Sequence, residues 1–159
     1  MSTESRVVPS IIQMVRAPFF SSILAPLAVG TLAAVAVTGS FSWIGFVLVL
    51  AMGLGLHAAT NVYNDIYDTK QGTDWVNAHR NEFSGGSGIL VRQPELMPRM
   101  YMLARVALVI AFVATVGLWI AAPPPLRPVL IGLYLLSAFF AKFYTAAPVK
   151  LASRGFGEL

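Results

Sequence analysis

The sequence predicts an all-α fold, a polytopic transmembrane helix bundle with about four spans in this chain. Hydrophobic residues make up 57% of the 159 residues and charged residues only 11%, and the mean hydropathy is +0.71. A soluble domain normally carries about a quarter charged residues, so this composition is typical of an integral membrane protein. The chain has no cysteine, which excludes disulfides, thiolate catalysis and cysteine-based metal sites.

Two apolar stretches near the N-terminus, residues about 17–38 and 43–66, predict the first pair of spans. Each stretch is long enough to cross about 30 Å of hydrocarbon. Pro26 predicts a kink in the first span, which neighbouring helices can accommodate in a membrane. The link of residues 39–42 is short, so the two helices should be antiparallel neighbours. Gly55 would allow another helix to approach the second span closely.

A polar stretch, residues 61–74, follows the second span directly. If the helix continues through this stretch, four side chains share one helix face at positions i, i+3, i+4 and i+7: Asn61, Asn64, Asp65 and Asp68. Gly72 is a typical helix end, and Asp74 lies just beyond it. Carboxylates at the mouth of an apolar span are costly unless they face water, protein or a cation, and hard oxygen ligands suit Mg²⁺. The alternative is a solvated helix end that only marks the membrane boundary.

The rest of the chain supplies a hydrophilic segment and two further spans. Residues about 69–99 are the one extended hydrophilic segment, and spans at about 100–122 and 128–144 follow. Consecutive prolines at 123–125 break the helix between these two spans. The glycine cluster at 85–88 lacks the Gly-Lys-Ser/Thr ending of a P-loop, so nucleotide binding by that route is not supported.

Charge distribution predicts the orientation in the membrane. Four spans place the N-terminus, the hydrophilic segment and the C-terminal tail on one side. Ten of the eleven Lys and Arg residues fall on that side and only Arg127 on the other, so the positive-inside rule makes that side cytoplasmic. All seven acidic residues fall there too, which gathers every candidate for chemistry on one face. The basic residues form no stripe with interleaved aromatics, so nucleic-acid binding is not predicted.

Three blocks of the sequence carry a resemblance to a known family. The first block, residues 64–74, has the pattern Asn-Asp-x-x-Asp-x-x-x-Gly-x-Asp, with Asn61 upstream. The second block is Phe-Ser-Gly-Gly-Ser at 83–87, and the third runs from Tyr144 to Glu158. Together they resemble the UbiA superfamily of membrane prenyltransferases and look most like its 1,4-dihydroxy-2-naphthoate polyprenyltransferase branch.

The resemblance implies Mg²⁺-dependent transfer of a polyprenyl group from prenyl diphosphate to an aromatic acceptor, which in that branch is 1,4-dihydroxy-2-naphthoate of menaquinone biosynthesis. The implied metal ligands are Asn64, Asp65, Asp68 and Asp74. Asn64 and Asp68 are preferred because they lie one helical turn apart. The implied substrate-binding residues, with no catalytic residue singled out, are Asn61, Lys70, Arg80, Lys142, Tyr144, Lys150 and Arg154. Each basic residue among them could instead contact lipid headgroups or set the topology.

Members of this superfamily have about nine spans and a second aspartate-rich motif in the other half of the bundle. The resemblance therefore implies that residues 1–159 are the N-terminal half of one prenyltransferase domain, and we expect this fragment alone to be inactive. Relatives that use 4-hydroxybenzoate or another acceptor share the first motif. Rivals from other classes are a transporter subunit with a cation site in the acidic stripe, and a structural membrane subunit. Beyond the substrates and the lipid bilayer of the cell membrane, no partner is predicted.

Overall fold

The computed structural model describes residues 8–76 and 86–154, and every regular element within these residues is helical. The η elements are short 3-10 helices. In chain order the elements are α1 (Ile11–Met14), η1 (Ala17–Phe20), α2 (Ser21–Thr38), α3 (Trp43–Gln71), α4 (Thr73–Val76), α5 (Ile89–Arg92), η2 (Pro94–Leu96), α6 (Met97–Ala121), η3 (Pro124–Leu126), α7 (Arg127–Phe143) and η4 (Leu151–Ser153).

Four helical stretches are long and apolar enough to cross a membrane: Ala17–Thr38, Trp43–Gln71, Pro94–Ala121 and Pro124–Phe143. This confirms the predicted all-α fold with four candidate spans, and it is the pattern of a multi-pass membrane protein. Two of the predicted boundaries differ. α3 continues past residue 66 to Gln71, and the third stretch begins at Pro94 rather than near residue 100. The hydrophilic segment between them is therefore shorter than the predicted 69–99.

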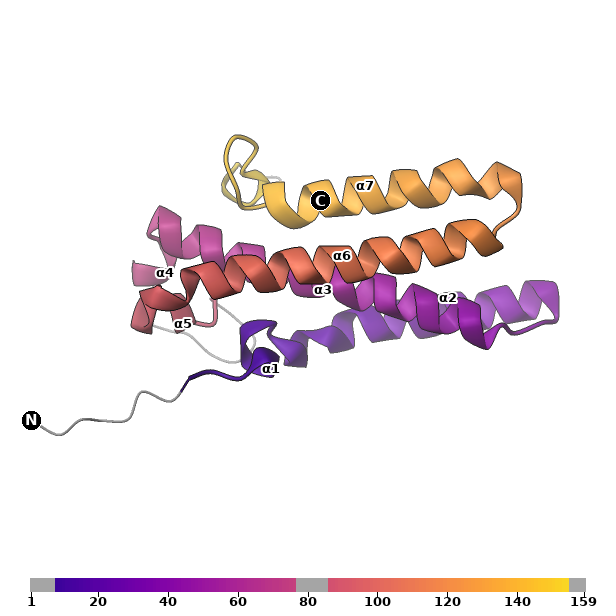
Figure 1. The fold of residues 1–159 in the computed structure, drawn as a ribbon, viewed down its shortest axis with the longest axis horizontal. Helices are drawn as coiled ribbons and strands as arrows, with labels where there is room; N and C mark the ends of the chain where they lie inside the picture. Colours follow the sequence, from indigo (N-terminus) through magenta and orange to yellow (C-terminus); the bar gives the residue numbers. More distant parts are fainter. Residues whose placement is uncertain (1–7, 77–85, 155–159) are drawn as a thin grey trace, which may run out of the picture.

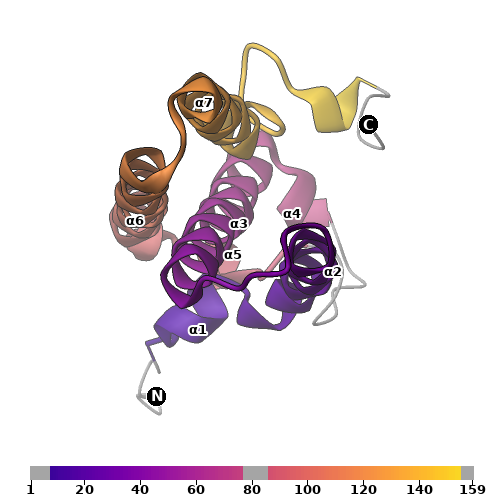
Figure 2. The same cartoon turned by 90° about the vertical axis from the view of Figure 1, so that its right-hand side faces the viewer.

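The four long helices α2, α3, α6 and α7 run along the long axis of the molecule (Figure 1). Seen along that axis, α3 lies between α2 on one side and α6 and α7 on the other (Figure 2). The connections α2–α3 and α6–α7 lie at one end. The opposite end, which we call the polar end, holds residues 8–16, 61–76, 86–93 and 144–154.

α3 has a capped start and a glycine end. The side chain of Ser42 accepts a hydrogen bond from the backbone N–H of Gly45 at 3.1 Å, and Gly72 closes the helix with a left-handed φ of 88°. With 29 residues at about 1.5 Å each, α3 is about 44 Å long, which exceeds the ~30 Å of a bilayer's hydrocarbon. Part of α3 therefore extends beyond the hydrocarbon. The polar residues of its last turns need not be buried in lipid.

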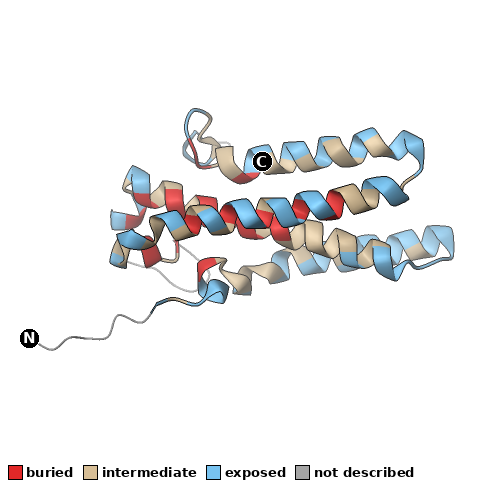
Figure 3. Cartoon of the chain, in the orientation of Figure 1, coloured by how far each residue is buried: buried red, intermediate tan, exposed pale blue. Residues whose placement is uncertain are grey.

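Small residues form the contact between α3 and α6. The buried residues there are Gly55, Ala58, Ala59, Ala104, Ala107, Ala111 and Ala114. A Cβ atom added at Gly55 would lie 2.7 Å from the backbone oxygen of Ala107, so the two helices touch through their backbones. Figure 3 shows the buried residues concentrated on α3 and α6. α2 has no buried residue. A groove of about 590 Å³ is lined by α2 and the first half of α3.

Candidate functional site at the polar end

The polar stripe predicted at 61–74 lies on the last turns of α3 and on α4. Its members do not converge on one point. Asn64 and Asp68 face the segment that follows α7, whereas Asn61 and Asp65 face the N-terminal segment and the residues just before α5. The stripe therefore contains two separate groups of contacts.

Asn64 and Asp68 form the first group, together with Thr145. The amide nitrogen Nδ2 of Asn64 donates to Asp68 Oδ2 at 2.8 Å and to Thr145 Oγ1 at 3.1 Å. Thr145 is buried, and its backbone oxygen accepts a hydrogen bond from Gln71 Nε2 at 2.8 Å. Asn64 thus contacts both residues through its nitrogen, and its Oδ1 has no hydrogen-bond partner among the described residues.

This donor set fits part of a magnesium shell. Mg²⁺ is usually held by one or two carboxylates, with substrate phosphates and waters filling the other positions. Asn64 Oδ1 and the Asp68 carboxylate are hard oxygen donors one turn apart on α3, although the Asn64 atom that contacts the carboxylate in this structure is the nitrogen Nδ2. Within the described residues, no group of three or more His, Cys, Asp or Glu side chains could hold a metal ion. A pair of this kind would leave the other positions around an ion to ligand and water oxygens.

Asp65 and Asn61 form the second group. Asp65 is 1% exposed, and its Oδ1 accepts the backbone N–H of Ser87 at 3.0 Å and lies 3.8 Å from Arg16 Nη1. Asp65 Oδ2 is buried with no hydrogen-bond partner in the described structure. Asn61 Nδ2 donates to the backbone oxygen of Val15 at 3.1 Å. The structure thus places these two predicted site residues against other parts of the chain.

Asp74, the last predicted metal ligand, packs against Thr69 and Gly86. It is 2% exposed, and its Oδ2 accepts a hydrogen bond from Thr69 Oγ1 at 3.2 Å. Gly86 lies directly against the Asp74 carboxylate, so an added Cβ would clash with both carboxylate oxygens. The φ of Gly86 is 66°, in the left-handed region that favours glycine.

Lys70 lies on the other side of α3 from Asp68. Two residues of an α-helix turn through about 200°, which points Lys70 toward α6. Its Nζ donates to Tyr101 Oη at 2.9 Å and lies 5.1 Å from the centre of the Tyr101 ring. Tyr67 packs edge-on against the same ring. The structure therefore does not bring Lys70 together with Asn64 and Asp68.

Four other predicted substrate-binding residues end α7 or follow it: Lys142, Tyr144, Lys150 and Arg154. Lys142 Nζ is 5.2 Å from the centre of the Phe143 ring, and Arg154 Nη2 donates to the backbone oxygen of Pro148 at 3.1 Å. The backbone oxygen of Tyr144 accepts from Ala152 N at 3.0 Å. Lys150 has a left-handed φ of 49°. Arg80 lies outside the described residues.

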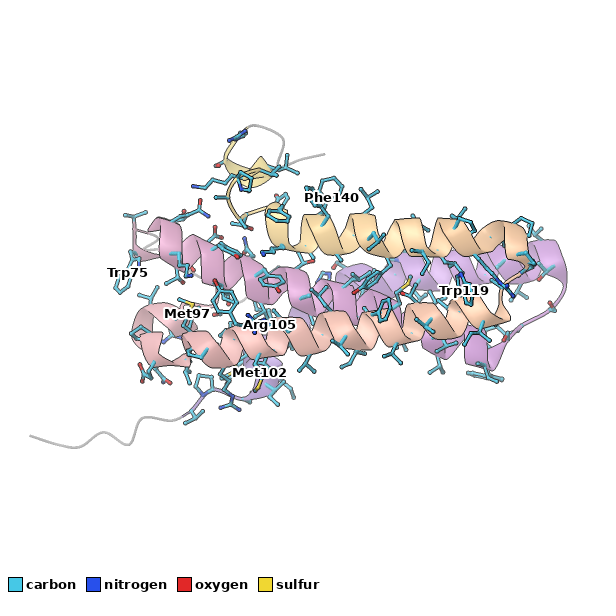
Figure 4. The ribbon with its side chains drawn as sticks, turned by 45° about the horizontal axis from the view of Figure 1, so that its top comes forward. Trp75, Met97, Met102, Arg105, Trp119 and Phe140 are labelled. Carbon is cyan, nitrogen blue, oxygen red and sulfur yellow. The ribbon has the colours of Figure 1, made fainter. Side chains whose placement is uncertain are left out.

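Arg105 and Arg127 lie toward opposite ends of the bundle. Arg105 lies on the half of α6 nearer the polar end, and Trp119 lies near the opposite end (Figure 4). Arg127, the basic residue predicted for the opposite side, stacks its guanidinium 4.8 Å from the centre of the Trp119 ring. An Arg beside a Trp at a helix end is typical of a membrane interface.

Three residues of the site were not predicted from the sequence: Arg16, Ser87 and Thr145. Thr145 follows the predicted Tyr144 in the third sequence block. The sequence therefore indicated this segment as part of the site, but it did not indicate the hydrogen bond between Thr145 and Asn64. The position of Arg16 could have indicated a paired charge, since it is a charged residue at the start of an apolar span. Ser87 contributes a backbone N–H, which no residue type reveals.

Comparison of this chain with known protein families, with curated proteins and with solved structures finds no match. Its function is therefore argued from the geometry of the polar end and from its sequence motifs.

Proposed function

We propose that this protein takes part in Mg²⁺-dependent transfer of a polyprenyl group from prenyl diphosphate to an aromatic acceptor. The observation that carries the proposal is the pairing of Asn64 and Asp68 on one face of α3, where the helix passes out of its apolar part. The resemblance of the three sequence blocks to UbiA-type prenyltransferases supports 1,4-dihydroxy-2-naphthoate as the acceptor.

The position of the pair suits an amphipathic substrate. A prenyl diphosphate has an apolar tail, which partitions into hydrocarbon, and a multiply charged head, which does not. Asn64 and Asp68 lie in the last turns of a helix about 44 Å long, where the head would leave a ~30 Å hydrocarbon layer. By the positive-inside rule, the polar end faces the cytoplasm.

The reaction breaks the bond between the allylic carbon and the diphosphate oxygen, and the electron pair leaves with the diphosphate. An electron pair of the aromatic ring forms the new carbon–carbon bond, and the ring carbon then releases its proton or, if it is carboxylated, carbon dioxide. Bound Mg²⁺ would neutralise charge on the departing diphosphate. Asn64 and Asp68 would hold that ion, while Thr145 fixes the orientation of the Asn64 amide.

Basic side chains after α7 would share the charge of the diphosphate. Lys142, Lys150 and Arg154 all belong to the segment whose Thr145 contacts Asn64. A guanidinium binds phosphate oxygens through a planar pair of donors, and an ammonium binds them as a point charge. The apolar sides of the helices at the polar end would exclude water from the developing allylic cation.

Binding of geranylgeranyl diphosphate to the 159-residue chain in lipid nanodiscs tests this function without requiring turnover. We expect binding in Mg²⁺ to be at least about tenfold tighter than in EDTA, and we expect Asp68→Asn to remove most of that difference. Glu95→Gln, an exposed acidic position in η2 away from the pair, is the control and should behave like wild type. Equal binding with and without Mg²⁺ would refute the proposal.

A further inference from the structure

Asp65 and Asp68 lie one turn apart on α3 but have different surroundings. The carboxylate of Asp65 is buried among protein groups, whereas Asp68 is only partly buried and accepts a hydrogen bond from the Nδ2 of Asn64. We propose that the acidic motif is divided in function. Asn64 and Asp68 face the ligand, while Asp65 is a positioning residue that fastens both the N-terminal segment and the turn at residues 86–88 to α3.

Arg16 is the contact between Asp65 and the N-terminal segment. Its Nη1 lies 3.8 Å from Asp65 Oδ1, and its guanidinium carbon lies 4.2 Å from the centre of the Phe19 ring. The backbone of Arg16 is left-handed, with φ 55° and ψ 52°. A non-glycine residue in this region is strained and persists only where its surroundings hold it. The pairing with the buried carboxylate is one such constraint.

Two further contacts hold the same segment against α3. Met14 is fully buried in the core formed with Val62 and Ile66, and the side chain of Asn61 donates to the backbone oxygen of Val15. Residues 14–16 therefore contact α3 through one apolar side chain, one hydrogen bond and one ion pair. Only the ion pair uses a formal charge of the acidic motif.

Ser87 is the contact between Asp65 and the turn. Its backbone N–H donates to Asp65 Oδ1 at 3.0 Å, and its Oγ accepts the N–H of Ile89 at 3.2 Å. Gly86 and Gly88 on either side have left-handed φ values of 66° and 65°. Ile89, which follows, is 4% exposed and joins the core. One carboxylate oxygen thus joins the polar turn to the N-terminal segment across α3.

These contacts offset part of the cost of burying Asp65. A buried carboxylate is stable only when it is paired and hydrogen-bonded, and removing its partner is strongly destabilising. Oδ1 of Asp65 has a guanidinium and a backbone donor from the chain itself, whereas Oδ2 has no hydrogen-bond partner in the described structure. The ligand-facing role of Asn64 and Asp68 rests on the proposed function. The fastening role of Asp65 rests on these contacts alone.

Two reporters distinguish the roles in the 159-residue chain in nanodiscs. Trypsin cleavage after Arg16 reports release of the N-terminal segment. Because the natural chain has no cysteine, alkylation of Ser87→Cys by a maleimide reports exposure of the turn. Asp65→Asn keeps an oxygen for the backbone N–H at 87 but loses the charge facing Arg16. It should speed cleavage at least about tenfold and leave alkylation within about twofold.

Asp65→Ala removes both contacts and should speed cleavage and alkylation alike, whereas the matched variant Asp68→Asn should change neither rate. Equal acceleration of cleavage by Asp68→Asn and Asp65→Asn would overturn the division. If Asp65→Ala fails to fold, Asp65→Asn decides the matter, and a wild-type cleavage rate in that variant would overturn the fastening role.

Mn²⁺ affinity, measured by electron paramagnetic resonance with geranylgeranyl diphosphate present, separates positioning from ligation. Asp68→Asn should weaken Mn²⁺ binding at least about tenfold, and Asp65→Asn less than about threefold. Equal weakening by the two variants would contradict the division. If the wild-type chain binds no Mn²⁺, the proposed function fails, while the cleavage and alkylation rates still decide the role of Asp65.

Discussion

Replacing Gly55 by alanine should loosen the contact between α3 and α6. An added Cβ would lie 2.7 Å from the backbone oxygen of Ala107 and 3.1 Å from the Cβ and backbone nitrogen of Ala111. None of these atoms belongs to a flexible side-chain end, so the helices themselves must separate. Overpacking of this kind costs about 1–3 kcal/mol.

Helix propensity stabilises the alanine variant and so opposes the effect of the clash. A control variant is needed to cancel this contribution to stability. Alanine is favoured over glycine inside a helix by about 1 kcal/mol. Gly132 in α7 has nothing within 4 Å of an added Cβ, so Gly132→Ala gains the propensity without the clash. Gly55→Ala should therefore be about 1–3 kcal/mol less stable than Gly132→Ala, because the propensity term is common to both.

Unfolding in mixed micelles of dodecyl maltoside and sodium dodecyl sulfate, followed by circular dichroism, measures this difference. We expect Gly132→Ala to unfold at the same or a higher denaturant fraction than wild type, and Gly55→Ala at a lower one. Gly30→Ala in α2, which also has open space, should behave like Gly132→Ala. Equal stability of Gly55→Ala and Gly132→Ala would show that the backbone contact between α3 and α6 is absent.

Two other predictions concern the site and the topology. Thr145→Val removes the hydroxyl that holds the Asn64 amide, so Mg²⁺-dependent binding of geranylgeranyl diphosphate should weaken by about 1 kcal/mol, or roughly fivefold. Thr115→Val, whose hydroxyl bonds only within α6, should leave binding unchanged, and an equal loss in both variants would argue against a role for Thr145. Single cysteines at Ser40 and Ser153 should react with an impermeant maleimide from opposite faces of a vesicle, and reaction of both from one face would exclude the four-span topology.

The arrangement of the long helices could be predicted because hydropathy and helix breakers are local properties. Each apolar stretch produced a helix, and Gly72 ends α3 in the left-handed conformation that glycine adopts readily. The close approach at Gly55 was also predicted from its small size, and the structure supplies its partner, Ala107. The start of the third span was displaced, from about residue 100 to Pro94.

The division of the polar stripe could not be predicted from spacing. Successive residues of a helix differ by about 100° in direction, so Asn64 and its neighbour Asp65 point to different parts of the bundle. Their partners are remote in sequence: Thr145 is 81 residues from Asn64, and Ser87 is 22 residues from Asp65. Such contacts depend on how the helices and loops are placed in space, and a single sequence does not record that placement.

The position of Lys70 illustrates the same point for charge. Its spacing from Asp68 put it in the same motif, but helix geometry directs it to Tyr101 on α6. A motif defined along the chain therefore combines residues that face a ligand with residues that face the protein. Burial separates them in this structure, because Asp65 and Asp74 are almost fully buried and Asp68 is not.

We propose above that the pair Asn64 and Asp68 holds a divalent ion that contacts a diphosphate. Electron–nuclear double resonance of Mn²⁺ in the nanodisc-bound chain, with geranylgeranyl diphosphate, measures the coupling between the ion and phosphorus. We expect a direct manganese–phosphorus coupling in wild type and in Glu95→Gln, and its loss from the protein-bound signal in Asp68→Asn. An unchanged coupling in Asp68→Asn, or a protein-bound Mn²⁺ signal with no phosphorus coupling, would contradict the claim.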